Sequence, residues 1–280
     1  MYLAQLSDPE STEYSVDCYF DISGAKKDDV DLAVAGMVHY HEILHSRYAQ
    51  SNGEPVRLVT DEYPTIRWTT ASSFEEAKER SIRKRRPFSL KSVPVRFTGY
   101  ELPDNRILLH MDIHHIAFDG RSVMIWQHEL FDRLQGRDIP PQPDLSARTQ
   151  DMHAHEAGTA FYRELFSDGV PSHEMPLKGP RLATHPGADK ELAVSITEEE
   201  LAQLSTAAKS CGVSTFSFLL AGMSIVLGIY CDSEDVTLGF PVDMRNKDER
   251  DMCGMFINTA IVRLKPQSGK SLPDYLAEVA

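Results

Sequence analysis

The sequence predicts a mixed α/β fold that is divided between two lobes. Stretches in which apolar and polar residues alternate, as in strands, recur between stretches whose apolar residues repeat every three or four positions, as in helices. A segment rich in proline and glycine, residues 167–190, is the best candidate for a linker between lobes. We therefore assign residues 1–175 to an N-terminal lobe, and residues 176–280 to the linker and the first part of a C-terminal lobe.

The N-terminal part of the chain contains patterns for a strand, a helix, a hairpin and a second helix. Residues 13–24 alternate apolar and polar side chains and end in a glycine, which predicts a strand. Residues 26–44 carry apolar side chains on one helical face and aspartates near the start, which favours a helix. In residues 46–60, the dipeptide Asn52-Gly53 is typical of a β-hairpin turn. Another helix is predicted at residues 74–86.

Two strands and a helix follow. The strands, residues 92–102 and 106–113, are joined by a Pro-Asp-Asn turn at residues 103–105. A helix is predicted at residues 121–135. The second strand is expected to place one set of side chains on each face: Ile107, Leu109, Met111 and Ile113 on one, and His110, Asp112 and His114 on the other.

The C-terminal half again mixes both patterns. Because its last residues begin a helical pattern that is not completed, we expect the chain to be part of a longer protein. The predicted elements are a helix at 147–166, a strand near 191–196, helices near 197–211 and 214–230, a strand at 235–242, and a strand followed by the start of a helix within 257–280.

Composition excludes several classes of protein. The formal net charge of −13 argues against nucleic acid as the main partner. There is no run of about 18 apolar residues and no signal peptide, so we predict a cytoplasmic protein with no membrane span. The four cysteines are far apart, which fits reduced thiols. The basic cluster at residues 78–88 fits the solvated end of a helix, with a docking patch for an acidic partner as the alternative.

One short motif suggests a zinc hydrolase. His41, Glu42 and His45 have the H-E-x-x-H spacing that would place two ligands and a general base together on a helix. The extension that would supply a third histidine is absent, and His41 continues the apolar face of the predicted helix. A core-facing histidine satisfied by a hydrogen bond, with no metal bound, is therefore the favoured interpretation.

A second motif, His114-His115-Ile116-Ala117-Phe118-Asp119-Gly120, follows the strand at 106–113. A side chain at the end of a strand can project into a cleft while the sheet holds its backbone. Asp119 and Gly120 then predict a tight turn into the N-terminus of a helix, where backbone N–H groups are free. This arrangement suits a catalytic base, although packing alone could also explain two adjacent histidines.

The H-H-x-x-x-D-G motif resembles that of the condensation domains of non-ribosomal peptide synthetases, whose superfamily includes chloramphenicol acetyltransferase. The resemblance covers essentially the whole chain, because further stretches are similar to the family's motifs and occur in the same order. The element Gly254–Thr259 favours condensation over epimerisation. The other similar stretches are "MYLAQLSDPES", "YHEILHSRY", which accounts for the apparent zinc motif, "RRPFSLKSVPVRF", "FYRELFSDGVPSHEMPLKGPR" and "GFPVDMRNKDERDMCGMFINTAIVRL".

The resemblance implies two chloramphenicol-acetyltransferase-like lobes with a tunnel between them, the second lobe being incomplete in this chain. The implied reaction forms an amide bond between an upstream carrier-bound acyl, aminoacyl or peptidyl thioester and the amine of a downstream carrier-bound amino acid. The implied partners are two peptidyl carrier protein domains and a neighbouring adenylation domain, in the biosynthesis of secondary metabolites such as antibiotics. The substrates would be held on the phosphopantetheine of the carriers, with no cofactor bound by the domain itself.

The resemblance also implies roles for four residues of the motif. His115 is expected to accept a proton from the attacking amine, or to orient that amine. His114 is expected to be buried and structural. Asp119 is expected to hold the loop through a salt bridge, and Gly120 to let a substrate approach the backbone, with its N–H facing the developing oxyanion.

The sequence lacks the arginines that the family uses to pair with the aspartate at the position of Asp119. The family usually carries arginine at the positions of Tyr40 and His45, and one of those arginines is expected to pair with the aspartate. Here Arg47 is the nearest arginine in that segment. Two other functions therefore stay open: an acyltransferase that uses a free alcohol or amine acceptor, and a catalytically idle module that only recruits carrier proteins.

Overall fold

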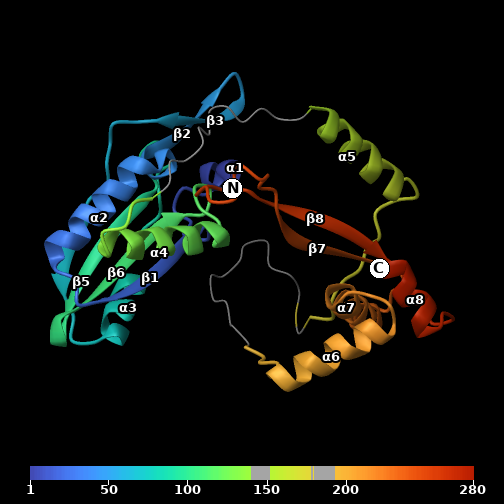
Figure 1. Ribbon diagram of the computed structural model, residues 1–280. Helices are drawn as coiled ribbons and strands as arrows, with labels where there is room; N and C mark the ends of the chain where they lie inside the picture. The colour runs from blue at the N-terminus through green and yellow to red at the C-terminus, as the bar shows by residue number, and fades with distance from the viewer. Residues whose placement is uncertain (140–151, 178, 180–192) are drawn as a thin grey trace. The chain divides into compact units, whose positions relative to one another are not determined.

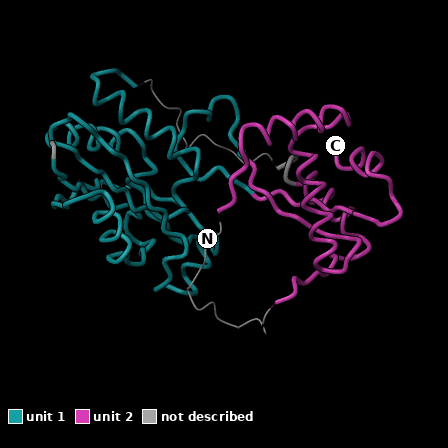
Figure 2. Tube along the Cα trace, turned by 90° about the horizontal axis from the view of Figure 1, so that it is seen from below, with its two compact units in different colours: residues 1–148, 243–258 teal, residues 149–242, 259–280 magenta. Residues whose placement is uncertain are grey.

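The computed structural model describes residues 1–139, 152–177, 179 and 193–280 (Figure 1). The predicted mixture of helices and strands is confirmed. The chain forms two compact units (Figure 2): unit 1 comprises residues 1–148 and 243–258, and unit 2 comprises residues 149–242 and 259–280. This division differs from the predicted boundary at residue 175 in two places: residues 152–175 belong to unit 2, and the late segment 243–258 belongs to unit 1.

A four-stranded sheet forms the centre of unit 1, with the strands in the order β1-β6-β5-β4. β6 pairs antiparallel with both β1 and β5, whereas β4 lies parallel to β5. The strands and turn predicted at 13–24, 92–102, 103–105 and 106–113 are confirmed, whereas β4 was not predicted. The bounds are β1 (Ser15–Ser23), β4 (Ile66–Thr70), β5 (Val95–Leu102), β6 (Arg106–His114) and the short turn η2 (Pro103–Asn105).

Helices cover both faces of this sheet, so that β6 is buried along almost its whole length. α2 (Lys27–Tyr40) and α4 (Gly120–Leu134) pack on the face that carries Leu109 and Met111. α3 (Phe74–Arg83) packs on the opposite face, where Leu108 lies. A short helix that the sequence did not predict, α1 (Tyr2–Ser7), precedes the sheet.

The helix predicted at 26–44 ends four residues earlier, at Tyr40. His41 adopts an extended backbone with φ of −100° and ψ of 98°, and a separate 3-10 turn, η1 (Glu42–His45), follows it. The predicted hairpin is confirmed as β2 (Ser46–Ser51) and β3 (Glu54–Val59). Its turn residues have φ of 53° at Asn52 and 87° at Gly53, the left-handed conformations that such a turn requires.

The described residues of unit 2 form four helices, and the strand pair β7 and β8 leads into and out of the segment 243–258. Its small core includes Ala221 on α7 and Tyr275 and Leu276 on α8, and the Tyr275 hydroxyl lies 2.5 Å from that of Ser224. The bounds are α5 (Met152–Leu165), α6 (Glu198–Ser210), α7 (Thr215–Cys231), β7 (Val236–Asp243), β8 (Ile257–Leu264) and α8 (Leu272–Val279).

Two further sets of predictions for the C-terminal half are not confirmed: one is wrong, and the other falls partly outside the described residues. The strand predicted at 191–196 is wrong for residues 193–196, which form no regular structure and leave Val194 80% exposed, with no partner strand among the described residues. Half of the predicted linker, residues 178 and 180–190, and the start of the helix predicted at 147 lie outside the described residues. In the part of the chain that is described, no single helix is long and apolar enough to span a membrane; α6 and α7 pass that test only as a pair bent by 95°.

Candidate active site

The sheet fixes the backbone of the His-His motif. His114 is the last residue of the central strand β6, and its N–H donates to the carbonyl of Pro94 at 2.9 Å. The N–H of His115 donates to the carbonyl of Tyr14 at 2.7 Å. Since segments on both sides of β6 hold these two N–H groups, the first residues of the loop have a defined position.

The two histidines differ in their surroundings. His114 is 1% exposed, and burial lowers its pKa to about 4, so the ring is neutral near neutral pH. His115 is half-buried. Its Nδ1 atom is inaccessible and has no hydrogen-bond partner among the described residues. The nitrogen of His115 that can meet a substrate is therefore Nε2.

Asp119 is the N-cap of α4, and both oxygens of its carboxylate have hydrogen-bond partners. It accepts hydrogen bonds from the N–H of Ser122 at 2.8 Å and from the N–H of Phe256 at 3.0 Å. It also forms a two-pronged ion pair with Arg245, in which Nη1 and Nη2 each lie 2.9 Å from one carboxylate oxygen. The side chains are 1% exposed for Arg245 and 0% for Asp119. A network of this kind fixes the loop to the helix that follows it.

The arginine partner of Asp119, which the sequence left open, is thus Arg245. Arg47 is exposed and lies on β2. Arg245 stands in the late motif "GFPVDMR", and it could be named as the partner only once folding had brought that segment onto α4. Burial opposes ionisation of Asp119, but the hydrogen bonds from Arg245, Phe256 and Ser122 outweigh it and lower the pKa of the carboxyl.

Ser122 joins the late segment to the start of α4. Its hydroxyl lies 2.7 Å from Asp119 Oδ1 and 2.8 Å from the carbonyl of Gly254, and it accepts the N–H of Gly254 at 2.9 Å. A Cβ at position 254 would lie 2.5 Å from the ring of Phe256, so only glycine fits there. Sequence reasoning did not single out Ser122, because nothing in its local pattern marks a contact with a residue so distant in the chain.

Gly120 is the first residue of α4 and is exposed. Its φ is not positive, and a Cβ added there would meet nothing within 4 Å. Neither backbone strain nor packing among the described residues therefore requires glycine at this position. Its N–H belongs to the first turn of a helix, where backbone donors have no partner within the helix.

The apparent zinc motif does not form a metal site of the kind that its spacing suggests. His41 Nε2 lies 2.5 Å from Glu129 Oε2, as expected for a satisfied core histidine. His45 bonds through Nδ1 to the carbonyl of Thr60 at 2.7 Å, and Glu42 pairs with Arg57 at 3.4 Å. These side chains diverge because the helix ends at Tyr40. Within the described residues, His41, Glu129 and Cys253 do place one potential ligand atom each within 4.8 Å of one another.

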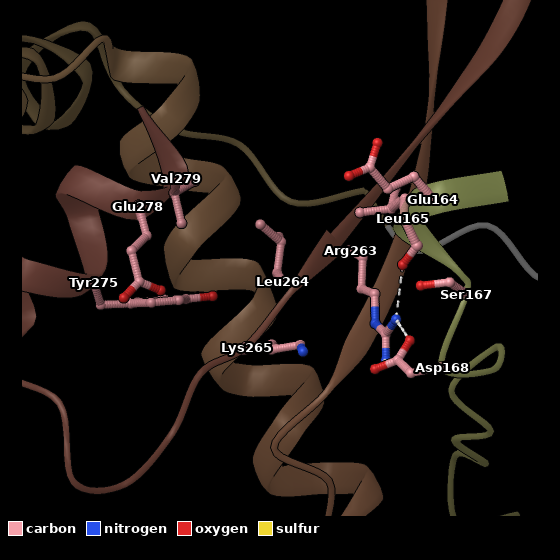
Figure 3. Close-up of a pocket in the computed structure, with 10 residues that line it drawn as sticks. All are labelled: Glu164, Leu165, Ser167, Asp168, Arg263, Leu264, Lys265, Tyr275, Glu278 and Val279. Atoms are coloured by element: carbon pink, nitrogen blue, oxygen red, sulfur yellow. Dashed lines mark hydrogen bonds and ion pairs between the residues drawn. The ribbon is translucent and has the colours of Figure 1, made fainter. Parts of the chain in front are cut away.

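Two further residues of the late motif lie on β8. Asn258 and Thr259 are exposed residues of β8. A pocket of about 380 Å³ in unit 2 is lined by Arg263, which pairs with Asp168 and donates to the carbonyl of Leu165 (Figure 3). Arg263 also pairs with Asp235. None of the residues of the His-His motif lines this pocket. A pocket of about 820 Å³ in unit 1 is not lined by motif residues either, but three of its lining residues contact the motif: Gln5 and Phe88 contact His114, and Tyr48 contacts Ile116.

Comparison with known proteins identifies the family. The profile described as "Condensation domain" matches residues 1–280. The chain belongs to the condensation-domain family. Among curated relatives of this condensation domain, tyrocidine synthase 3 from Brevibacillus parabrevis is 28% identical over 256 residues, a stretch that covers 88% of this chain and 4% of that protein. The chain thus spans only a small part of the curated proteins that it matches.

Solved structures show that the fold is shared. The first condensation domain of the calcium-dependent antibiotic synthetase, in complex with substrate analogue 3a, matches with a TM-score of 0.74 at 23% identity, over 99% of this chain and 71% of that one. The X-domain from teicoplanin biosynthesis, in its complex with OxyB, matches with a TM-score of 0.83 at 18% identity, over 96% of this chain and 64% of that one.

Proposed function

We propose that this condensation domain is an acyltransferase that forms an amide bond between two carrier-bound substrates of a non-ribosomal peptide synthetase. The proposal depends on one observation above all: His115 lies at the end of the central strand, half-buried, on a loop fixed by the buried Asp119–Arg245 pair. A catalytically inactive module with this fold would not require a rigid loop that presents an imidazole. The family to which the chain belongs supports the same reaction.

In the proposed reaction, the amine of the downstream aminoacyl group attacks the carbonyl carbon of the upstream thioester. A C–N bond forms, and the carbonyl oxygen takes the negative charge of a tetrahedral intermediate. Nε2 of His115 accepts the proton that the amine releases, because Nδ1 is inaccessible. The C–S bond then breaks, and the proton passes to the departing phosphopantetheine thiolate.

Two neighbouring features would assist this step without taking part in proton transfer. The N–H groups at the start of α4, beginning with Gly120, can donate to the oxyanion, and the open space beside Gly120 leaves room for the substrate. The Asp119–Arg245 pair is buried, so its role is to position the loop. The phosphopantetheine arms belong to the carriers, and peptidyl carrier and adenylation domains are the partners that this function requires.

The test is a transfer assay with the full-length natural protein. The upstream carrier is loaded with an acyl or aminoacyl thioester and the downstream carrier with an amino acid, and mass spectrometry follows the product on each carrier. A positioned base contributes roughly 10²- to 10⁴-fold to a rate, so His115→Ala should slow transfer by about that factor. His128→Ala, which replaces an exposed histidine of α4 in the same unit, should leave the rate unchanged.

The outcomes separate the proposal from its alternatives. Product on the downstream carrier that disappears in His115→Ala supports amide formation. Product that appears only on a free amine or alcohol would favour a free-acceptor acyltransferase. If wild type binds loaded carriers but transfers nothing, the recruiting module is favoured. The X-domain in complex with OxyB, which shares the fold, makes this last outcome a real alternative.

A further inference from the structure

The side chain of Gln5, on the short N-terminal helix α1, is buried at 4% exposure and has one possible orientation. Its amide nitrogen faces three carbonyl oxygens, those of Asp8 at 3.4 Å, Pro9 at 3.3 Å and Ser11 at 3.3 Å. Because carbonyls accept and do not donate, the NH₂ group must be on this side. The amide oxygen Oε1 is therefore fixed on the opposite side, where it lies 3.1 Å from His114 Nε2.

This contact, together with a second one, determines which nitrogen of His114 carries the proton. The backbone N–H of Ile116 lies 3.0 Å from His114 Nδ1 and can only donate, so Nδ1 must be the unprotonated nitrogen. Nε2 then carries the proton and donates it to Gln5 Oε1. The neutral Nε2–H form satisfies both contacts, whereas the Nδ1–H form and the doubly protonated ring each lose the bond to Ile116.

The ring of His114 thereby supports the loop that carries His115 through a hydrogen bond to the loop backbone. Its Nδ1 holds the N–H of Ile116, and the carbonyl of Ile116 accepts the hydroxyl of Tyr48 at 3.3 Å. The ring itself lies against Tyr14 and Phe88, at centroid distances of 5.7 and 6.2 Å. A rotation or a change of tautomer at His114 would release the residue directly after His115.

We propose that Gln5 is a positioning residue, which keeps His114 in its neutral Nε2–H form and thereby fixes the loop that presents His115. Its role in activity rests on the proposed function, whereas its effect on His114 does not. Neutrality matters because a positive charge on His114 would oppose protonation of the adjacent His115, which has to accept a proton. The titratable groups that face His114 among the described residues are the N-terminal ammonium group, His115 and Tyr14, and no carboxyl group that could stabilise a charged His114 is among them.

The first experiment needs no substrate. Protein labelled with ¹⁵N-histidine is examined by NMR, in which the imidazole nitrogen shifts report the tautomer and charge of each ring. The His114 signals are assigned from their contacts with the Tyr14 and Phe88 rings. Wild type should show a protonated Nε2 and an unprotonated Nδ1 throughout the neutral range. Gln5→Glu should raise the midpoint of the His114 titration by about 1 to 3 pH units, because a carboxylate favours the cation.

The second experiment measures transfer against pH for the same variants. Gln5→Glu should lose activity as the pH falls through the new His114 midpoint. Gln5→Met, which has a similar shape and no charge, should lower kcat roughly tenfold through misplacement of the loop, with little change in KM or in the pH profile. Gln127→Glu, a matched substitution at an exposed glutamine of α4, should behave as wild type.

A wild-type ring with its proton on Nδ1 would overturn the proposal, and so would a Gln5→Glu protein whose His114 titration and pH profile match those of wild type. If Gln5→Glu does not fold, the wild-type tautomer and the kinetics of Gln5→Met still decide. If wild type transfers nothing, the NMR result still decides the inference on Gln5, while the proposed function fails on its own.

Discussion

Arg245 places a full positive charge where water does not reach. The cost of desolvating it is offset by Asp119 on one side, by the carbonyl of Met252 at 3.1 Å, and by the face of the Phe256 ring, whose centroid lies 4.3 Å from the guanidinium carbon. A planar five-donor group can satisfy these partners together, whereas a lysine could not. The pair therefore holds the loop that carries His115 and the late segment in one arrangement.

Replacing Arg245 by methionine should be strongly destabilising, because it leaves Asp119 buried without its cation. Breaking a buried pair costs about 3 to 5 kcal/mol in the free energy of unfolding. Denaturant unfolding followed by tryptophan fluorescence measures this, since both tryptophans, Trp68 and Trp126, lie in unit 1.

A matched control is Arg121→Met. Arg121 is a half-exposed arginine of the same unit that lies 3.7 Å from Asp243, and its loss should cost about 1 kcal/mol or less. The double variant Asp119→Asn with Arg245→Met should recover part of the stability, because the unpaired charge is removed. Equal unfolding free energies for Arg245→Met and Arg121→Met would show that the buried pair does not stabilise unit 1.

The start of α4 is the element that combines these residues. Asp119 caps it, Ser122 joins it to Gly254, and Gly120 leaves the space before it open. A cap of this kind stabilises the helix by about 1 kcal/mol and leaves the first N–H groups free for a ligand. The element therefore stabilises the fold with one set of groups and can bind substrate with another.

Gly120→Ala separates these two roles. An added methyl meets no atom within 4 Å and alanine favours a helix, so the unfolding free energy of unit 1 should change by less than about 1 kcal/mol. Transfer between loaded carriers should nevertheless fall about tenfold or more, because the methyl would occupy the space next to the oxyanion. A variant that folds normally and transfers at the wild-type rate would remove Gly120 from the site.

Elements with a strong local signal were predictable, and elements that depend on their surroundings were not. The hairpin at Asn52 and Gly53 requires left-handed backbone that these residue types supply, so its sequence suffices. The strand β4 has no such signal, and it forms because β5 offers a parallel partner. Residues 193–196 have a strand-like pattern but find no partner strand among the described residues, so that local preference has no effect.

The stability of unit 1 as a whole should depend on pH through His114. Its pKa is about 4 in the folded protein and about 6.5 for an unperturbed histidine, so the unfolded chain binds the proton first as the pH falls. The part of the folding stability that requires a neutral His114 is fully present above pH 6.5 and is lost as the pH falls from 6.5 to 4. The loss is on the order of 3 kcal/mol, from 1.36 kcal/mol for each pKa unit.

Three buried or half-buried carboxyl groups also affect how the free energy of unfolding depends on pH, and they do not all change it in the same direction. Burial raises the pKa of Asp112, so this residue favours the folded state as the pH falls. The carboxyls of Asp17 and Asp119 have lowered pKa values and lose their stabilising effect only below about pH 4. Comparing wild type with His114→Gln from pH 7 to pH 4 isolates the histidine: the difference in unfolding free energy should change across this range. Parallel curves would contradict the prediction, and His128→Gln should give parallel curves.

The sequence by itself determined what depends on nearest neighbours along the chain. The strand, turn and helix that carry His114 to Gly120, and the order of the family's motifs, could be predicted because backbone preferences and side-chain periodicity act over a few residues. Only the tertiary structure decided which distant groups complete the site. Arg245 contacts Asp119, and Gln5 contacts His114, although each pair is separated by more than a hundred positions in the sequence. Burial is the physical reason, because a charge or an N–H group removed from water needs a partner, and only the packed chain determines which residue is close enough to be that partner.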